Sequence, residues 1–581
     1  MKNHLSSTAA IAAIGVFGEF GARATFTAVA LAALAACSDS PDPAATTAPP
    51  PAAAALGLSG TAATGGAVAA RGVEAKCRSG TGTATTAVDG SYSMSITSGT
   101  LPCAMRVTLA DGSALHSLAT GSGTTARANL TPVSQLAVAR LSGGDPAALY
   151  AGFDATAAAA LDNSAVQAAA AAVVQVLRDA GVDFSTAGDL FTAPLVAANG
   201  STAGNAFDQA LDLLRTRLAA SGTTLAALAG TLARSSPAAP ATALSGTPSL
   251  PAVQQLQPAA AHCAALRSGR YRYVVAMPTL NGQFETGVST LNASTLTFSN
   301  GSDSTVITPV AGVPCRFSVA DGSQIVVSQA GVLVISQPES GAMRMALAFP
   351  EQAITLAELT GEWNILGSTA NGGSYTLSSA TLTVSAAGAI TSGQYCDNLR
   401  ACLPVPSGNA FRANASGGFE LYNSIDSGID RAFAYRSGGG ELMALFVAPD
   451  GTLSLLSRKR VNTLPALPAA ANNTWGLTAN NLGVTSGITD SSNTVISVNP
   501  INNTFVRNNI INSSTGLTRP ETLTVNSPRD GYNTRHGETV TASDGSTSTV
   551  SEFVALGLRG AGLAAVAFPA SNQFTVSVVK P

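Results

Sequence analysis

Three apolar segments decide how the second half of this chain is organised: Gly341-Ala-Met-Arg-Met-Ala-Leu-Ala-Phe-Pro350, Gly440-Glu-Leu-Met-Ala-Leu-Phe-Val-Ala-Pro449 and Gly560-Ala-Gly-Leu-Ala-Ala-Val-Ala-Phe-Pro569. Each begins at a glycine, continues as an apolar run and ends at a proline, which is typical of a short buried strand bounded by turn residues. Their similar composition indicates an internal repeat. The sequence therefore predicts three β units in tandem.

The start of each predicted unit supports the repeat. Gly269-Arg-Tyr271, Gly361-Glu-Trp363 and Asn473-Thr-Trp475 all carry an aromatic third residue, and each precedes its closing proline by a similar interval. Asp321-Gly322 and Asp450-Gly451 mark hairpin turns inside the units. Units of this length allow roughly six to eight strands, enough to close a small barrel without exposed edges. We predict about three small β-barrels or β-sandwiches, over residues 261–358, 359–465 and 466–581.

The composition points to an exported, multidomain protein. A chain of 581 residues is longer than one hydrophobic core usually organises. Hydrophobic residues make up 46% and charged residues only 11%, which suits small, tightly turned strands. The net charge of −3 and the absence of any Lys/Arg-rich run argue against a nucleic-acid partner.

Residues 1–36 are predicted to be a targeting segment. Its apolar run, Ala24 to Ala36, is shorter than the ~20 residues that span a bilayer. The run ends in Leu34-Ala35-Ala36-Cys37, which resembles the bacterial lipobox. This resemblance implies a lipoprotein signal peptide, lipidation of Cys37, and a membrane partner reached through acyl chains on that cysteine. Ser38 is not the aspartate that retains many such proteins in the inner membrane, so we expect the outer membrane; an ordinary secretory signal is the alternative.

The cysteine count agrees with export. Setting Cys37 aside leaves six cysteines, which fall two by two into separate regions of the chain. Pairing within regions selects one connectivity out of those that six cysteines allow. Free buried thiols are the alternative. The predicted disulfides are Cys77–Cys103, Cys263–Cys315 and Cys396–Cys402.

A Pro/Ala-rich tether, residues 37–55, precedes a small β domain at residues 56–128. The segment Asp89-Gly90-Ser91-Tyr92 reads as a hairpin and resembles the carboxypeptidase-regulatory-like, transthyretin-like β-sandwich. Ala87 replaces the first aspartate of that family's pattern, so the match is partial. The resemblance implies an accessory module without catalytic residues.

Residues 129–234 are Ala-rich and predict a short helical bundle. Thr131-Pro132 and Asp145-Pro146 are helix starts, and Ser164 to Ala180 reads as a capped helix. Asn205 to Ser221 carries an apolar stripe that we expect to face a core, with a docking groove as the alternative. A Pro-rich linker follows at residues 235–260. The residues of the stripe are Phe207, Leu211, Leu214 and Leu218.

Gly361-Glu-Trp363 also resembles the G-x-W opening of lipocalin-type barrels, in which the Trp packs under an Arg from the last strand. Arg458 or Arg460 stands where that partner is expected. The resemblance implies a barrel that can carry a small apolar ligand. Barrels of this size are also often filled by side chains, and a filled interior is what we expect here.

Residues suited to catalysis are scattered. His116, His262 and His536 lie in different regions without metal-ligand spacing, and Arg529-Asp530 with Arg535-His536 reads as a solvated polar loop. No nucleophile, phosphate-binding or zinc motif is present in the sequence, so we predict no catalytic, cofactor or metal site.

The sequence therefore favours a multidomain, mainly β protein with an α-helical middle segment. Its predicted role is that of a lipid-anchored cell-envelope protein with a non-catalytic structural, adhesive or binding function. The expected partner is an unknown envelope protein or glycan. A lipocalin-like carrier is the first alternative and an envelope hydrolase the second.

Overall fold

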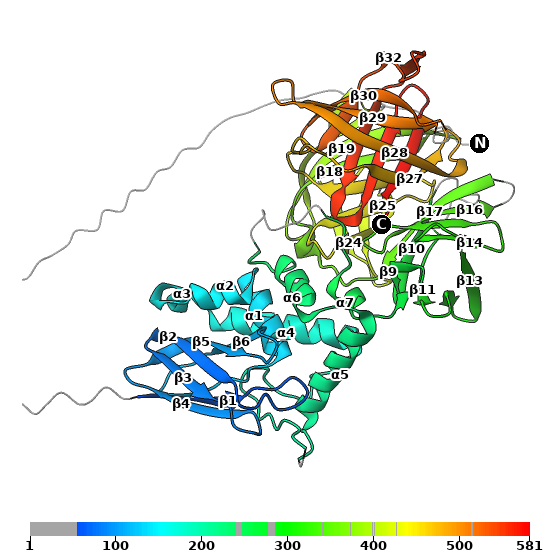
Figure 1. Ribbon diagram of the computed structural model, residues 1–581. Coiled ribbons are helices and arrows are strands. Elements are labelled where there is room, and N and C mark those ends of the chain that lie inside the picture. The colour runs from blue at the N-terminus through cyan, green and yellow to red at the C-terminus, as the bar shows by residue number, and fades with distance from the viewer. Residues whose placement is uncertain are drawn as a thin grey trace, which may run out of the picture. The chain divides into compact units, whose positions relative to one another are not determined.

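The structure is a computed structural model that describes residues 55–200, 202–239, 247–276, 285–339, 342–371, 373–397, 399, 401–425, 427–512 and 515–581. The predicted signal peptide, Cys37 and nearly all of the tether lie outside these residues. The described chain is a multidomain, mainly β protein with an α-helical middle segment, which confirms the predicted fold class (Figure 1). None of its helices is long and apolar enough to cross a membrane.

The first domain is a sandwich of a three-stranded and a four-stranded sheet that share one apolar core. The Asp89-Gly90 turn is not the hairpin that we predicted, because β3 pairs with β2 whereas β4 pairs with β1. The turn therefore carries the chain from one sheet to the other. The strands are β1 (Leu56–Thr61), β2 (Gly72–Ser79), β3 (Thr81–Thr85), β4 (Ser91–Ile96), β5 (Thr100–Thr108), β6 (Ala114–Ala119) and β7 (Thr125–Arg127).

The helical segment follows its sequence signals closely. The Thr131 side chain caps α1 and the Asp145 side chain caps α2. In α5 the predicted stripe faces the core of the bundle, with Phe207 1% exposed. The predicted linker contains α7 and the buried Leu256, so this part of it belongs to the folded chain. The helices are α1 (Pro132–Ser142), α2 (Pro146–Ala151), α3 (Ala155–Ala160), α4 (Asn163–Asp179), α5 (Ala206–Ser221), α6 (Leu225–Arg234) and α7 (Ala252–Gln255).

The first β unit is a closed barrel in which consecutive strands pair antiparallel and the last strand returns to the first. Two short strands, β8 (Ala259–Ala260) and β9 (Cys263–Arg267), precede it. The predicted Asp321-Gly322 turn joins β14 to β15 as a hairpin. The barrel strands are β10 (Gly269–Ala276), β11 (Glu285–Asn292), β12 (Thr297–Asn300), β13 (Asp303–Pro309), β14 (Arg316–Val319), β15 (Gln324–Val327), β16 (Leu333–Glu339) and β17 (Ala342–Pro350).

The second β unit is a nine-stranded sheet whose two ends meet. Backbone hydrogen bonds from Ile390 to Asn409 (2.9 Å) and from Phe411 to Gly388 (2.8 Å) join the start of β20 to the start of β22. The β20–β21 hairpin therefore lies beyond this closure. The strands are β18 (Gly361–Asn371), β19 (Ser374–Val384), β20 (Ile390–Asp397), β21 (Ala401–Pro404), β22 (Ala410–Ala413), β23 (Phe419–Tyr422), β24 (Ile429–Arg436), β25 (Leu442–Val447) and β26 (Leu453–Arg458).

The third β unit is again a closed barrel, with a separate two-stranded hairpin inserted between its fifth and sixth strands. The barrel strands are β27 (Asn472–Ala479), β28 (Thr485–Asn499), β29 (Thr504–Asn512), β30 (Leu517–Val525), β31 (Tyr532–Arg535), β34 (Phe553–Leu558), β35 (Leu563–Phe568) and β36 (Gln573–Val579), and the inserted hairpin is β32 (Glu538–Thr541) with β33 (Thr547–Val550).

The three β units confirm the predicted tandem architecture but correct the alignment of the repeat. Pro350 ends β17, the last strand of its barrel, which pairs back with β10. Pro449 and Pro569 instead follow β25 and β35, each of which precedes the last strand of its unit. The segment that ends at Pro350 is therefore the last strand of its unit, whereas the segments that end at Pro449 and Pro569 are the last strand but one. The alignment was wrong by one strand because apolar strands of similar composition align equally well in either position.

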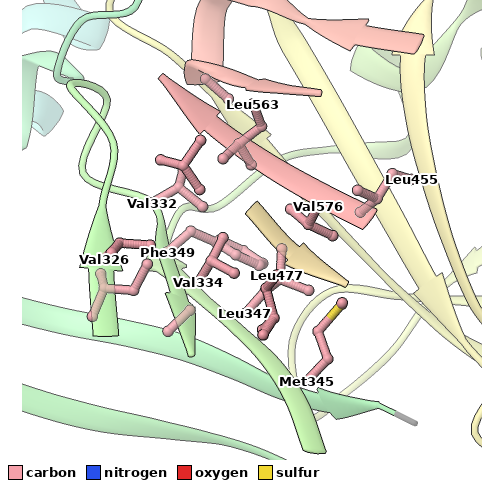
Figure 2. Packing of buried hydrophobic residues seen from close by; sticks show 14 of the residues in the cluster. Val326, Val332, Val334, Met345, Leu347, Phe349, Leu455, Leu477, Leu563 and Val576 are labelled. Carbon is pink, nitrogen blue, oxygen red and sulfur yellow. The ribbon is translucent and has the colours of Figure 1, made fainter. Parts of the chain in front are cut away.

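One apolar core is shared by all three β units. Val334, Leu347 and Phe349 of the first unit pack with Leu455 of the second and Leu477 of the third (Figure 2). Leu347 and Val334 lie on the strand face opposite Ala346 and Ala348, and so on the outside of their barrel. The units therefore bury their outer faces against one another.

Candidate ligand-binding site

The structure contains three disulfides, and they join the pairs that the sequence predicts: Cys77–Cys103, Cys263–Cys315 and Cys396–Cys402. The first links β2 to β5 within one sheet, and the third lies across the β20–β21 hairpin. The second joins β9 to the residue before β14. These cysteines are structural cross-links and hold no reactive thiol.

The residues of the G-x-W resemblance come together at one end of the second barrel. The Arg458 guanidinium lies 4.1 Å from the centre of the Trp363 ring, and the two residues are direct partners across β18 and β26. Gly361 permits this contact, because a Cβ there would lie 2.9 Å from Arg458 Nη1. Arg460, the other sequence candidate, pairs with Glu441 instead.

Hydrogen bonds complete this end of the barrel. Arg458 donates to the carbonyls of Glu358, Leu359 and Thr360, around the short helix η2 (Leu356–Leu359). Trp363 Nε1 donates to the Leu359 carbonyl at 2.9 Å. Burial lowers the pKa of Arg458, but only to about 10. Because this value is well above neutral pH, the guanidinium stays charged.

The inside of the second barrel is filled, as predicted. One apolar cluster includes Trp363, Ile365, Phe411 and Phe419, contributed by strands around the barrel. These side chains are almost completely buried, and none of them is more than 4% exposed. The interior of the barrel with the lipocalin-like opening is therefore occupied by its own side chains.

The first barrel contains that space, which corrects the expectation that the barrels are filled. A cavity of about 280 Å³ lies inside it and is lined from all eight strands. Its volume is near the lower end of the roughly 300–1,000 Å³ typical of ligand pockets and holds far more than a single water at ~30 Å³. The small side chains of Ala346 and Ala348 on β17 leave space for the cavity, whereas their partners on β10 are larger. Its apolar lining includes Val275, Phe298, Ile307, Val319, Ile325, Leu333 and Ile335.

Polar side chains gather at one end of the cavity. Glu285, Asp321 and Gln337 line it, and all three lie at or beside connections on the same end of the barrel. Arg344 pairs with Glu285 at 3.1 Å although the arginine side chain is only 4% exposed. The cavity thus has an apolar body and a polar end, the pattern of sites that orient a ligand through a few hydrogen bonds.

Tyr273 forms one wall of the cavity. It faces Gly287 across β10 and β11, and its ring occupies the space where a Gly287 Cβ would stand. Burial, and then the nearby Glu285 carboxylate, raise the pKa of Tyr273, so its hydroxyl remains protonated and able to donate. The glycine therefore sets how far the tyrosine ring reaches into the barrel.

The described residues show no arrangement suited to catalysis at this cavity. No group of three or more His, Cys, Asp and Glu side chains within them is placed to hold a metal. His116 lies in the sandwich and bonds Gln135, whereas His536 lies in the third barrel beside Arg535. The histidines of the described chain therefore belong to separate domains, as the sequence suggests.

Comparison with known proteins identifies no family for this chain. No protein-family profile matches it, and no curated protein matches it. Solved structures that match in part include a mutant of the vaccine antigen transferrin binding protein B from Haemophilus parasuis Hp5 (9% identity, 53% of this chain and 74% of that one, TM-score 0.14). Another is isotype 1 transferrin binding protein B from serogroup B Neisseria meningitidis (9% identity, 54% and 76%, TM-score 0.13). Similarity this low carries no argument about fold or function.

Proposed function

We propose that this protein is a lipid-anchored, non-catalytic binding protein of the bacterial cell envelope, and that its first barrel binds a small, mainly apolar molecule. The cavity of about 280 Å³ carries the proposal. Its aliphatic and aromatic walls favour an apolar body, since burying such surface contributes ~25 cal/mol per Å². Glu285 and Gln337 at the polar end favour a ligand with a hydroxyl or amine that can donate hydrogen bonds.

Filling the cavity tests this proposal. We expect the fluorescent apolar probe N-phenyl-1-naphthylamine to bind the full chain, and Ala348→Leu to weaken binding at least tenfold because the added side chain occupies the space beside Tyr273. Thr308→Leu is the matched control, since Thr308 is exposed on the outside of β13. A probe that binds both variants equally, or does not bind the wild type, would rule out the cavity as the site.

The membrane anchor is a separate part of the proposal and rests on the Leu34-Ala35-Ala36-Cys37 motif. We expect Cys37→Ser to move the protein from the membrane fraction to the soluble periplasmic fraction, because the thiol that accepts the acyl chains is removed. Cys396→Ser is the control, since it also replaces one cysteine by serine and breaks only the short disulfide to Cys402, leaving the motif intact. Continued membrane association of the Cys37→Ser protein contradicts lipid anchoring.

The wider role proposed here is contact with an envelope protein or glycan. Crosslinking in intact cells, followed by identification of the captured protein or sugar, tests this role. Loss of the same crosslinks in the Cys37→Ser protein would show that the anchor brings the partners together. A wild-type protein that gives no crosslinks would leave ligand binding in the first barrel as the proposed activity.

A further inference from the structure

The third barrel contains a charged cluster that sequence analysis did not recognise. Glu521 on β30 has a fully buried side chain that pairs with three arginines. Arg535 Nη1 lies 2.6 Å from it, and Arg507 Nη2 and Arg519 Nη2 each lie 3.1 Å from it. Arg535, which we predicted to lie in a solvated loop, is 6% exposed and belongs to β31.

The strand register places this cluster inside the barrel. Arg507 is the direct partner of Glu521, and Arg535 is the partner of Leu523, two residues further along β30. All four residues therefore share one face of the sheet. The opposite face points outward, because the Tyr532 hydroxyl donates to the Ile365 carbonyl of the second barrel at 2.8 Å.

The three arginines differ in how many of their N–H donors form hydrogen bonds. Arg535 also donates to the Ser551 carbonyl from Nε and Nη2, and its guanidinium lies 4.6 Å from the centre of the Phe553 ring. The Nε atoms of Arg507 and Arg519 are buried and find no hydrogen-bond partner among the described residues. Both arginines keep some exposure, 21% and 24% of their side chains.

The charges of the cluster do not balance. Three guanidinium groups surround one carboxylate, and removing each cation from water costs several kcal/mol unless it is paired. Burial lowers the pKa of Arg507, and the nearby Glu521 only partly offsets this effect. Burial acts to raise the pKa of Glu521, but Arg507 and Arg535 outweigh it and hold the carboxylate ionised. A second negative charge would stabilise this arrangement.

We infer that the third barrel binds a small oxyanion, a phosphate or carboxylate group, between Arg507 and Arg519. Arginine suits this role because its planar fork of N–H donors matches the oxygens of both groups. Arg535 and Glu521 hold the two arginines in position rather than contacting the anion. This site lies in a different barrel from the apolar cavity and does not depend on it.

Thermal unfolding of the soluble Cys37→Ser chain tests the inference. We expect inorganic phosphate to raise the unfolding temperature saturably above that in sodium chloride of equal ionic strength, and Arg519→Gln to abolish the rise. Arg412→Gln should keep it, since Arg412 is an exposed arginine stacked on Tyr422 in the second barrel. Acetate distinguishes the two kinds of ligand. If both anions raise the unfolding temperature, the site accepts oxyanions in general; if only phosphate raises it, the site is specific for phosphate. The absence of any rise overturns the inference.

A second variant distinguishes loss of anion binding from loss of folding. Glu521→Gln removes the carboxylate that pairs with the three arginines, so a binding site predicts a larger phosphate-induced rise than in the wild type. If the cluster is only a structural ion-pair network, the variant unfolds earlier and phosphate restores nothing. Titration with N-phenyl-1-naphthylamine should be unchanged in Arg519→Gln, which separates this site from the cavity of the first barrel.

Discussion

At the scale of single residues, Arg458 has the clearest energetic role. Its guanidinium covers the Trp363 ring and donates to three carbonyls around η2, so its loss would remove three hydrogen bonds from a charged group together with the ring contact. We expect Arg458→Ala to lower the free energy of unfolding by ~2–4 kcal/mol, given ~1.5–3 kcal/mol for a hydrogen bond from a charged group.

Urea unfolding of the variant measures this loss. Arg412→Ala is the control, because Arg412 also stacks on an aromatic ring in the same barrel but is exposed. A stack at the surface is worth only ~0.5–1 kcal/mol. Equal losses in the two variants would show that the hydrogen bonds to the carbonyls contribute little.

His116 gives a prediction about pH. Gln135 Oε1 accepts from the backbone N–H of His116 and lies 2.9 Å from Nδ1, so Nδ1 carries the proton and the buried Nε2 has no partner among the described residues. Burial lowers the pKa of His116, against opposing effects of Gln135 and Asp145. The unfolded chain therefore binds a proton more readily than the folded one.

The sign of this effect follows from proton linkage. Stability from the neutral imidazole is fully present above the unfolded pKa of about 6.5 and is lost as the pH falls below it. We expect the wild type to lose more unfolding free energy between pH 7.5 and pH 5.5 than His116→Gln, as measured by urea denaturation at both values. Parallel losses in the two proteins would contradict a buried neutral histidine.

At the scale of elements, the disulfides should differ in their contribution. Cys263–Cys315 closes a loop of 52 residues and Cys396–Cys402 one of only 6. The loop-entropy relation gives about 4 kcal/mol for the longer loop and about 2 kcal/mol for the shorter one. Double Cys→Ser variants of each pair, compared by denaturant unfolding, should follow this order; the reverse order would show that strain or residual structure dominates.

Elements whose signals are local could be predicted from sequence. N-cap residues and prolines at helix starts predicted α1 and α2, and turn residues predicted the hairpin at Asp321-Gly322. The hairpin predicted at Asp89-Gly90 was wrong, because a tight turn can join two strands of one sheet or strands of two different sheets. Long-range pairing decides between these outcomes, and a local motif carries no information about it.

The two interior sites could not be predicted for a related reason. The cavity depends on the summed volume of side chains from eight strands, and no local pattern reports that sum. Arg535 sits in a polar stretch that resembles a loop, and only its register against Leu523 turns it inward. Alternation of polar and apolar residues in β30, from Thr522 to Val525, was the one available signal, because Glu521 and Arg519 continue the face of Leu523.

At the scale of the whole molecule, the shared core ties the three β units together. Leu477, Leu563 and Val576 of the third unit are buried in one cluster with residues of the first and second units (Figure 2). We expect residues 466–581 alone to bind apolar dyes and self-associate, whereas residues 261–581 remain monomeric, because large exposed apolar patches drive association. Size-exclusion chromatography of both fragments measures this, and a monomeric isolated unit would contradict it.

The burial of outer barrel faces has a consequence for evolution of the chain. Since the shared core supplies part of the stability from outside the barrels, the residues that point inward can differ more from one unit to the next. The three barrels illustrate the result, with an open apolar cavity in the first, a filled interior in the second and a charged cluster in the third. A mutational scan should therefore find the inner face of the first barrel, where the cavity lies, more tolerant than its outer face, and this interior is where new binding specificities can arise or be engineered.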